Sequence, residues 1–547
     1  MPAAVGPGCL HSRRGGANSG VRYVAIIEGG LIVRATLRLA RAPVYRRAGA
    51  AWDRPTLDAM TRGPGGRGLA SIVDGGRRVD ASEMDTMVGM LAGSLRRRGV
   101  RHGDTVAWQL PNWFETVVLY RACWRLGAVA APLHHQAGGN DVGRMVDQLE
   151  PRVTFAAPGA ALGEIGPVVT VRGAGGSRND TFDELLGGPS VTRSTARPSD
   201  IAAVLFTSGS TGDPKGVLHT HRGLAYKMAQ MVGVHGLGPS DVSLMPLPMA
   251  HVSGLLNGLL VPAAAGMATV LMQRWDPSAA LGLIEAEHVS FMVGPPTLFN
   301  GLMDTPTFEP ERVTTLRLLS TGAMGVSTAF VADASARLDA RVKRTYGATE
   351  IPTVTTSEAG DPPERGRETE GHVLGDGELR TVDPATGRDV VPGEPGEVWF
   401  RGPEMFAGYL DAEATRGAMH RGWFRTGDLG ELDADGWLRI VGRLKDLIIR
   451  GGENISPAEV ERVLVEHPSV RQAVVVGYPD ARVGERVAAF VVSDGPFDLD
   501  RCREWFGQRG VARFKTPERV VRLDTMPLLP AGKPDLAQLR QRAVSAS

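Results

Sequence analysis

Short apolar runs alternate with longer amphipathic stretches along most of the chain. Residues 106–110 and 129–133 have the length and composition of buried strands, and residues 113–126 between them predict a helix. Later apolar runs at 289–293 and 316–320 predict further strands. Strands that alternate with helices in this way form a parallel sheet whose faces are covered by helices. We therefore predict an α/β fold.

Polar residues between these runs predict turns and helix ends. Gly75-Gly76 lies between two short runs of strand formers and predicts a hairpin turn. Ser82, with Asp85 three residues later, predicts the cap of an amphipathic helix. Residues 219–232 predict another helix.

Two adjacent histidines follow one predicted strand. His134 and His135 could form a metal-binding pair, but neighbouring residues on a strand point to opposite faces of the sheet. We therefore interpret them as part of a loop or of a pocket wall.

Length and charge limit the classes of protein that fit. A chain of 547 residues exceeds a single core, so we expect two or more domains. A formal net charge of +1 with 22% charged residues indicates no nucleic-acid partner. The most apolar stretch, residues 255–272, contains Asn257, Pro262 and Gly266, and we expect it to be buried core and not a transmembrane segment.

Cysteine usage bears on the compartment. Cys9, Cys123 and Cys502 are far apart and lack the CxxC spacing of zinc sites and redox motifs. The pattern therefore argues against a disulfide framework and favours a reducing, cytoplasmic location.

A glycine-rich segment at 207–217 reads TSGSTGDPKGV. Its glycines permit left-handed backbone, and its N–H groups, hydroxyls and one ammonium can form a seat for phosphate oxygens. The apolar run 201–206 predicts a strand before it, and open α/β sheets bind ligands at the carboxyl ends of strands. A flexible surface linker would need neither that strand nor Lys215, and the spacing differs from that of a Walker A loop. The predicted phosphate-binding residues are Thr207, Ser208, Gly209, Ser210, Thr211, Gly212 and Lys215.

The segment Tyr346-Gly347-Ala348-Thr349-Glu350 is the second candidate binding motif. The Tyr346 ring can stack on adenine, and Gly347 permits close approach of the backbone. Thr349 can bond a phosphate oxygen, and Glu350 supplies the hard oxygen that Mg²⁺ prefers. An exposed tyrosine and glutamate on an ordinary turn would explain either residue alone, but not all five together.

A third motif, at 423–428, reads WFRTGD. A carboxylate after a tight glycine turn suits the two ribose hydroxyls, which are donors that need a charged acceptor. We predict this role for Asp428. Farther along, Ser456, Pro457 and Glu459 have the spacing of a helix capping box, which gives Glu459 a structural and not a catalytic role.

In their order along the chain, these motifs resemble those of the adenylate-forming enzymes, which comprise acyl-CoA synthetases, luciferases and the adenylation domains of peptide synthetases. The similarity runs from about residue 70 to the C-terminus and is strongest to acyl-CoA synthetases for fatty, alicyclic or aromatic acids. It implies a large N-terminal domain, 46–443, of helix-covered sheets with a distorted barrel. A small mobile α+β domain, 444–547, would follow, with its hinge at Lys445. Residues 1–45 match nothing in the family and form an unassigned extension.

The resemblance also assigns individual roles. His251 would lie at the floor of the active site, although a histidine in an apolar run is more often core, and both interpretations stay open. Gly322 and Ala323 would contact adenine through their backbone, in a turn where Thr321 and Met324 depart from the family pattern. Arg443 would make a second contact with the ribose, and Gly451 and Gly452 would line the pantetheine tunnel. Lys533 would bridge the substrate carboxylate and the α-phosphate.

The implied activity has two half-reactions that use ATP, Mg²⁺ and CoA. An apolar carboxylic acid would form acyl-AMP with release of pyrophosphate, and CoA would then take the acyl group, as in fatty acid metabolism. The residues implied for catalysis are Lys533, Glu350, Thr211, Lys215 and His251, and those for the metal are Thr207 and Glu350. No acidic residue follows His251 until Asp276, which argues against an amino-acid substrate.

Other classes of function remain open at this stage. The acceptor could be a carrier protein or an amine in place of CoA. A luciferase-like oxidase and a non-enzymatic nucleotide-binding module are further alternatives. The sequence leaves a homodimer open.

Overall fold

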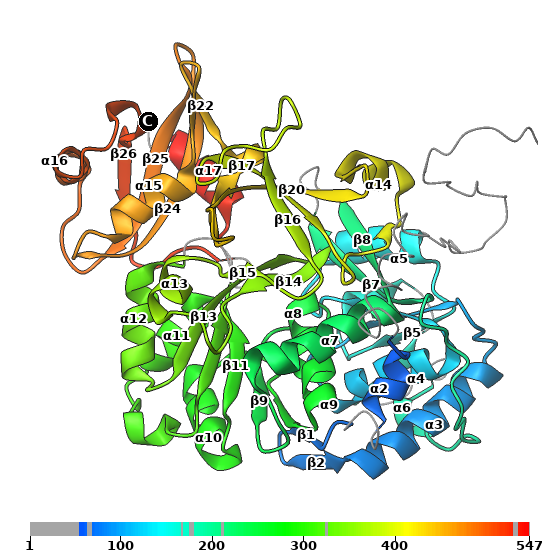
Figure 1. The fold of residues 1–547 in the computed structure, drawn as a ribbon. Coiled ribbons are helices and arrows are strands. Elements are labelled where there is room, and N and C mark those ends of the chain that lie inside the picture. Colours follow the sequence, from blue (N-terminus) through cyan, green and yellow to red (C-terminus); the bar gives the residue numbers. More distant parts are fainter. Residues whose placement is uncertain are drawn as a thin grey trace, which may run out of the picture.

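The computed structural model describes residues 54–62, 68–165, 168–173, 180–208, 213–322, 326–528 and 534–545. The first of its sheets has nine strands in the order β15-β14-β13-β12-β11-β9-β10-β1-β2 (Figure 1). The run from β1 to β13 is parallel, and β2, β14 and β15 are antiparallel at the edges. The strands are β1 (Ser71–Asp74), β2 (Arg77–Asp80), β9 (Val242–Met245), β10 (Ala268–Leu271), β11 (Phe291–Gly294), β12 (Leu318–Thr321), β13 (Arg341–Ala348), β14 (Ile351–Thr356) and β15 (His372–Val373).

The second sheet has seven strands in the order β18-β8-β7-β4-β3-β5-β6. Strands β3 to β7 are parallel, whereas β8 pairs antiparallel with β7 and β18 pairs antiparallel with β8. The strands are β3 (Thr105–Gln109), β4 (Val129–Leu133), β5 (Val153–Ala156), β6 (Val169–Thr170), β7 (Ile201–Ser208), β8 (Pro214–Thr220) and β18 (Gly408–Tyr409). The strands and the hairpin predicted from the sequence are thereby confirmed.

Helices cover the faces of both sheets, as the alternating pattern predicts (Figure 1). The main core cluster contains Leu119, Leu224 and Leu259, so it joins α4, α7 and the π-helical segment η2. The predicted burial of the apolar stretch that begins at residue 255 is confirmed. The helices of this part are α2 (Leu57–Thr61), α3 (Ala81–Arg97), α4 (Phe114–Leu126), α5 (Gly139–Leu149), η1 (Ala161–Glu164), α6 (Phe182–Leu185), α7 (His221–His235), α8 (Val252–Leu255), η2 (Leu256–Leu260), α9 (Val261–Ala265), α10 (Pro277–Glu287), α11 (Pro296–Met303), η3 (Pro310–Val313), α12 (Thr328–Arg337), α13 (Pro363–Glu368) and α14 (Ala412–Ala418).

A third, antiparallel sheet follows, and a fourth belongs to the smaller C-terminal part. The third runs β16-β17-β20-β19, with β21 paired to β20. The fourth runs β23-β22-β25-β24, with β26 paired to β25, and α15 and α17 pack against β24. The elements are β16 (Glu378–Val382), β17 (Pro395–Arg401), β19 (Met419–His420), β20 (Trp423–Leu432), β21 (Leu438–Arg443), η4 (Leu444–Asp446), β22 (Ile448–Arg450), β23 (Glu453–Ile455), α15 (Pro457–Val465), β24 (Val470–Asp480), β25 (Gly484–Ser493), α16 (Leu499–Gln508), η5 (Arg513–Lys515), β26 (Arg519–Arg522) and α17 (Leu536–Ser545).

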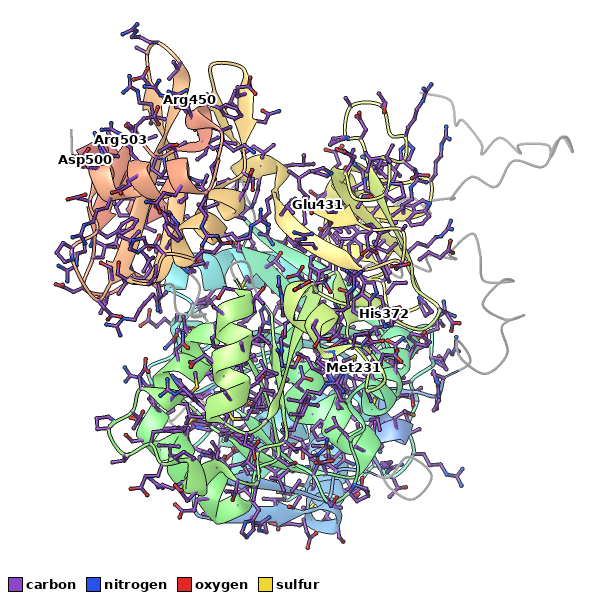
Figure 2. All side chains as sticks on the ribbon, turned by 60° about the vertical axis from the view of Figure 1, so that its left-hand side comes forward. Met231, His372, Glu431, Arg450, Asp500 and Arg503 are labelled. Carbon is purple, nitrogen blue, oxygen red and sulfur yellow. The ribbon has the colours of Figure 1, made fainter. Side chains whose placement is uncertain are left out.

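The smaller part has hydrophobic clusters of its own on both faces of β24 and β25. Figure 2 shows Arg450, Asp500 and Arg503 on this part and Met231 and His372 on the larger one. The predicted mixed α/β architecture, with a large N-terminal and a smaller C-terminal part, is confirmed. Lys445 lies in η4, between the last strand of the third sheet and the first strand of the fourth. In the part of the chain that the structure describes, no helix has the length and apolarity that crossing a bilayer requires.

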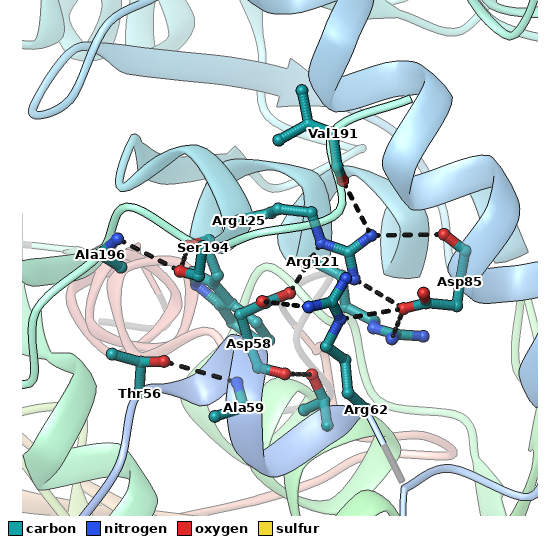
Figure 3. A network of polar contacts seen from close by, with 12 residues as sticks. Thr56, Asp58, Ala59, Arg62, Asp85, Arg121, Arg125, Val191, Ser194 and Ala196 are labelled. Atoms are coloured by element: carbon teal, nitrogen blue, oxygen red, sulfur yellow. Dashed lines mark hydrogen bonds and ion pairs between the residues drawn. The ribbon is translucent and has the colours of Figure 1, made fainter. Parts of the chain in front are cut away.

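A partly buried ion-pair network links the N-terminal helices (Figure 3). Arg125 of α4, which is 1% exposed, contacts Asp58 of α2 at 3.1 Å and Asp85 of α3 at 2.6 Å. Arg121 and Arg62 also contact Asp85, at 2.9 and 3.4 Å. Burial lowers the pKa of Arg121 to about 10. The network fixes the packing of three helices whose sequence positions are far apart.

Two helix starts differ from the sequence predictions. Asp80, not Ser82, caps α3, because its Oδ1 accepts hydrogen bonds of 2.8 Å from the N–H groups of Ser82 and Glu83. The predicted helix at 219–232 begins at His221, because His219 lies in β8 and pairs with β7. An apolar stretch that can pair with a neighbouring strand follows tertiary context and not local propensity.

The loop interpretation of His134 and His135 is confirmed although the reason given for it was not, and the predicted capping box before α15 was wrong. His134 and His135 follow the end of β4, so strand alternation does not apply, and their rings stack with centroids 4.9 Å apart. They belong to a turn, as the loop interpretation required. Before α15, Ser456 makes no capping hydrogen bond, because its hydroxyl donates to the Val441 carbonyl. Glu459 accepts from Lys515 at 2.6 Å and so completes no capping box.

Candidate functional site

The β7–β8 hairpin carries the two ends of the glycine-rich loop. Thr207 is paired with Lys215 across the hairpin, and β7 lies parallel to β4. The loop therefore leaves the second sheet at the carboxyl ends of its parallel strands, where such sheets bind ligands. Several predicted residues lie outside the described part of the chain or, for Ser208, have only their backbone described: Gly209, Ser210, Thr211, Gly212, Ala323, Lys533 and the Ser208 side chain.

The second motif forms the tip of the β13–β14 hairpin. Ala348 pairs with Ile351, so Thr349 and Glu350 are the two residues that turn the chain. A Cβ atom on Gly347 would lie 2.4 Å from the N atom of Thr353. Gly347 is therefore required by the chain's own backbone, whatever ligand approaches it.

Tyr409 links Glu350 to the phosphate-loop hairpin. Its hydroxyl donates to Oε1 of Glu350 at 2.6 Å, and β18, which carries it, pairs with β8. The Nζ atom of Lys215 lies 5.6 Å from the centre of the Tyr409 ring. Burial and the Glu350 charge raise the pKa of Tyr409, so its hydroxyl stays a donor. Tyr409 was not predicted from the sequence, because a tyrosine after an apolar run has no pattern that distinguishes it from a core residue.

Asp428 is the centre of a second polar group. Its Oδ2 accepts from the hydroxyl of Tyr346 at 2.8 Å, and its Oδ1 accepts from Nε of Arg443 at 2.7 Å. Asp428 is only 4% exposed and lies opposite Arg443 in the β20–β21 pairing. Burial, followed by the charge of Asp428, raises the pKa of Tyr346, which keeps its hydroxyl protonated. Each carboxylate oxygen has more than one lone pair, so Asp428 retains acceptor capacity for hydroxyl donors.

An apolar cluster joins these polar groups. It contains Val217 of β8, Tyr346 of β13, Tyr409 of β18 and Phe424 of β20, all buried. The structure thus brings the three motifs together, although up to about two hundred residues separate them along the chain.

Other predicted residues lie near the same sheet ends. A Cβ atom on Gly322 would lie 2.9 Å from the carbonyl oxygen of Thr345, so the ends of β12 and β13 nearly touch. His251 precedes α8, and its Nδ1 accepts from the N–H of Ser253 at 3.2 Å. His219, which the sequence analysis assigned to a helix, is buried on β8; burial lowers its pKa to about 4, against a smaller opposing effect of a hydrogen bond to the Thr349 backbone.

Gly451 and Gly452 occupy the two-residue turn between β22 and β23 in the smaller part. Their φ angles of 60° and 92° lie in the left-handed region, which explains why glycine occurs at both positions. Within the described residues, no cluster of three or more His, Cys, Asp and Glu side chains could hold a metal ion. Thr207 and Glu350 nevertheless offer oxygen donors of the kind Mg²⁺ takes when substrate phosphates supply other ligands.

A separate cavity of about 470 Å³ lies between the end of α3 and the segment 190–195. Arg96, Arg101 and Arg193 line it over a floor that includes Val100 and Leu126. None of the motif residues lines this cavity, so it is not the site formed by the three motifs.

Comparison with protein families gives two matches. The family described as AMP-binding enzyme matches residues 61–410, and the family described as AMP-binding enzyme C-terminal domain matches residues 459–533. The second match covers most of the smaller part, including Lys533.

Several relatives are named as CoA ligases. The medium-chain fatty-acid–CoA ligase of Escherichia coli is 30% identical over 530 residues, with 92% of this chain and 93% of the relative covered. The indoleacetate–CoA ligase of Aromatoleum aromaticum is 32% identical, with 85% and 93% covered. Among solved structures, ATP-bound MatB from Rhodopseudomonas palustris superposes with a TM-score of 0.81 at 29% identity and covers 89% of this chain and 99% of its own.

Proposed function

Because this chain belongs to the AMP-binding enzyme family, we propose that it is an ATP-dependent acyl-CoA synthetase for an apolar carboxylic acid. The observation that carries the proposal is the convergence of the three motifs. Tyr346 holds Asp428 beside Arg443, and the neighbouring Glu350 is held by Tyr409 next to Lys215. The residues proposed to contact the ribose, the metal and the phosphates therefore come together from three different sheets.

In the first half-reaction, a carboxylate oxygen of the substrate attacks the α-phosphorus of ATP. A new P–O bond forms as the bond to the β-phosphate oxygen breaks, and pyrophosphate leaves. The protein needs no nucleophile of its own, so its contribution is positioning and charge neutralisation. Lys215 and the hydroxyls and N–H groups of the loop would hold the phosphates, while Lys533 would bridge the reacting carboxylate and the α-phosphate oxygens.

The nucleotide would be oriented by the remaining motif residues. Asp428 would accept hydrogen bonds from the ribose hydroxyls, and Arg443 would donate to a ribose oxygen. The 346–349 strand end with Gly322 would border the adenine. Thr207 and Glu350 would hold Mg²⁺, which neutralises phosphate charge when bound. His251 would form part of the wall near the acyl group.

In the second half-reaction, the thiolate sulfur of CoA attacks the acyl carbonyl and AMP leaves. The smaller part, 444–547, would turn about Lys445 relative to residues 46–443, so that Lys533 withdraws and the Gly451–Gly452 turn lines the path of the thiol. One site would thus serve two reactions in sequence.

An apolar acyl group is supported by the buried segment 255–260 and by the substrates that the names of the relatives state. We place the reaction in the cytoplasm and in the metabolism of fatty or related acids, in accord with the cysteine pattern.

The test is pyrophosphate release from ATP and Mg²⁺ across a panel of straight-chain, alicyclic and aromatic acids, each with and without CoA. Turnover that requires both one acid class and CoA would support the proposal and identify the substrate. Acid-dependent release without sustained CoA-dependent turnover would retain adenylation and indicate an amine or carrier-protein acceptor. Release in the absence of any acid, or none with any acid from folded protein, would contradict the proposal.

A further inference from the structure

The hairpin that carries Glu350 is irregular in a way that the motif itself does not require. Between the pairs Tyr346–Thr355 and Ala348–Ile351, β13 contributes one residue and β14 contributes three, so β14 bulges. Thr353, in the middle of the bulge, has a φ of 41°. A β-branched residue rarely adopts this conformation, and such strain persists only where surrounding structure enforces it.

A buried lysine of α7 donates a hydrogen bond to the bulge. Lys227 of α7 is 0% exposed, and its Nζ atom donates to the carbonyl oxygen of Thr353 at 2.9 Å. The same ammonium donates to the amide oxygen of Gln230 and lies 2.8 Å from Oε1 of Glu404, which is 1% exposed. The two buried charges therefore compensate each other, and Lys227 uses its other donors on the helix and on the bulge.

Glu404 belongs to a segment that holds the other side of the same turn. Two residues after it, the N–H of Phe406 donates to the carbonyl oxygen of Glu350 at 2.8 Å. Three residues farther, Tyr409 holds the Glu350 carboxylate. The Glu350 turn is thus fixed between the bulge and the segment 404–409, and the Lys227–Glu404 pair joins these two supports to α7.

A gain in folding stability does not by itself explain the buried pair of Lys227 and Glu404. A buried ion pair is often no more stabilising than apolar side chains of similar volume, because both charges lose their hydration. What apolar side chains could not supply is a donor to the strained Thr353 carbonyl. Bulges beside active sites commonly re-aim a side chain, and this one lies three residues after Glu350.

We infer that Lys227 and Glu404 are positioning residues for the proposed reaction: through the Thr353 carbonyl and the 404–409 segment they aim the Glu350 carboxylate at the metal bound to the ATP phosphates. This inference rests on the proposed function, because it concerns the affinity of the ATP–metal complex. Neither residue touches substrate. Removing the pair should weaken metal and nucleotide binding without unfolding the protein.

The experiment compares wild type with the double variant Lys227→Met/Glu404→Met, which removes both charges at similar volume. We expect unfolding by urea to change little, whereas the half-saturating Mg²⁺ concentration for acid-dependent pyrophosphate release should rise on the order of tenfold. A second readout needs no turnover: the increase in Tm that ATP with Mg²⁺ produces, in the absence of any acid, should require more Mg²⁺ in the double variant.

The matched control is Arg125→Met, which breaks a buried ion pair between α4 and α2 and should lower stability without changing the Mg²⁺ dependence. The single variant Lys227→Met provides a second comparison, since it leaves Glu404 buried and unpaired and should lose both stability and Mg²⁺ affinity. If the double variant is stable and has the wild-type Mg²⁺ dependence in both readouts, the inference is wrong while the proposed function stands. If wild type shows no acid-dependent pyrophosphate release, the proposed function fails first.

Discussion

The hydroxyl of Tyr346 donates a hydrogen bond to Oδ2 of Asp428 over 2.8 Å, although 82 residues separate the two along the chain. Asp428 also accepts from Arg443 on the neighbouring strand. The predicted adenine contact and the predicted ribose contact are therefore one physical unit. A change in either residue alters the geometry of the other.

Replacing Tyr346 by Phe tests this coupling. The ring would remain while Asp428 loses one donor, and a hydrogen bond to a charged group contributes about 1.5 kcal/mol or more. We expect the KM for ATP to rise roughly tenfold, with a smaller change in kcat. Steady-state kinetics with varied ATP measures this effect. An unchanged KM would show that the Tyr346 hydroxyl does not orient the ribose contact.

Replacing Tyr409 by Phe removes the donor to Glu350 and keeps the ring beside Lys215. Groups that orient a metal ligand typically contribute 10- to 100-fold to affinity or activity, so we expect kcat/KM to fall on the order of tenfold at limiting Mg²⁺. Saturating Mg²⁺ should restore part of the rate. Equal loss of rate at every Mg²⁺ concentration would contradict the assigned role of Tyr409.

Replacing Lys533 by Ala separates the two half-reactions. Adenylation should be lost, because no cation would then bridge the carboxylate and the α-phosphate, whereas thioester formation from supplied acyl-AMP should be largely retained. Pyrophosphate release and acyl-CoA formation are measured separately. Equal loss of both steps in Lys533→Ala would refute the role proposed for that lysine.

The reciprocal variant, Lys445→Pro, stiffens the proposed hinge and should impair thioester formation more than adenylation.

Replacing Arg125 by Met tests the network shown in Figure 3. The change leaves Asp58, itself 1% exposed, without its closest cation, and breaking a buried pair costs about 3–5 kcal/mol. The urea midpoint of the large part should fall accordingly. The exposed pair of Arg144 and Asp141 offers a control, because Arg144→Met should change stability by less than about 0.5 kcal/mol.

The pH dependence of stability should reflect buried histidines. Burial lowers the pKa of His221 from its ordinary 6.5 to about 4. Between these values the unfolded chain binds a proton that the folded protein does not, so stability is present above about pH 6.5 and is lost as the pH falls toward 4. The contribution is about 3 kcal/mol.

His221→Gln keeps an acceptor for the N–H of Leu57, which the Nδ1 atom now accepts at 3.2 Å. Urea unfolding at pH 5 and at pH 7.5 should therefore show a smaller difference for the variant than for wild type. The same difference in both proteins would mean that other groups carry the acid sensitivity.

The sequence by itself determined the elements whose patterns are local. The runs at 106–110 and 129–133 have the length of strands and are apolar except for Gln109, which favours buried strands. Two consecutive glycines at 75–76 and at 451–452 permitted the tight turns that the structure has. The motif residues could be predicted because phosphate, ribose and metal each require particular donors or acceptors. Glycine, threonine, lysine and aspartate in such spacing are recognisable without coordinates.

Only the tertiary structure decided which partners those residues have. His219 became a strand residue because β7 was available to pair with it, and Ser456 turned from its helix to the Val441 carbonyl. Tyr409 donates to Glu350, and Lys227 donates to the Thr353 carbonyl, because β18 and α7 pack beside the β13–β14 hairpin. Neither role can be recognised from the residue type. Contacts between distant segments depend on which surfaces pack together when the chain folds, and a local sequence pattern does not specify those surfaces.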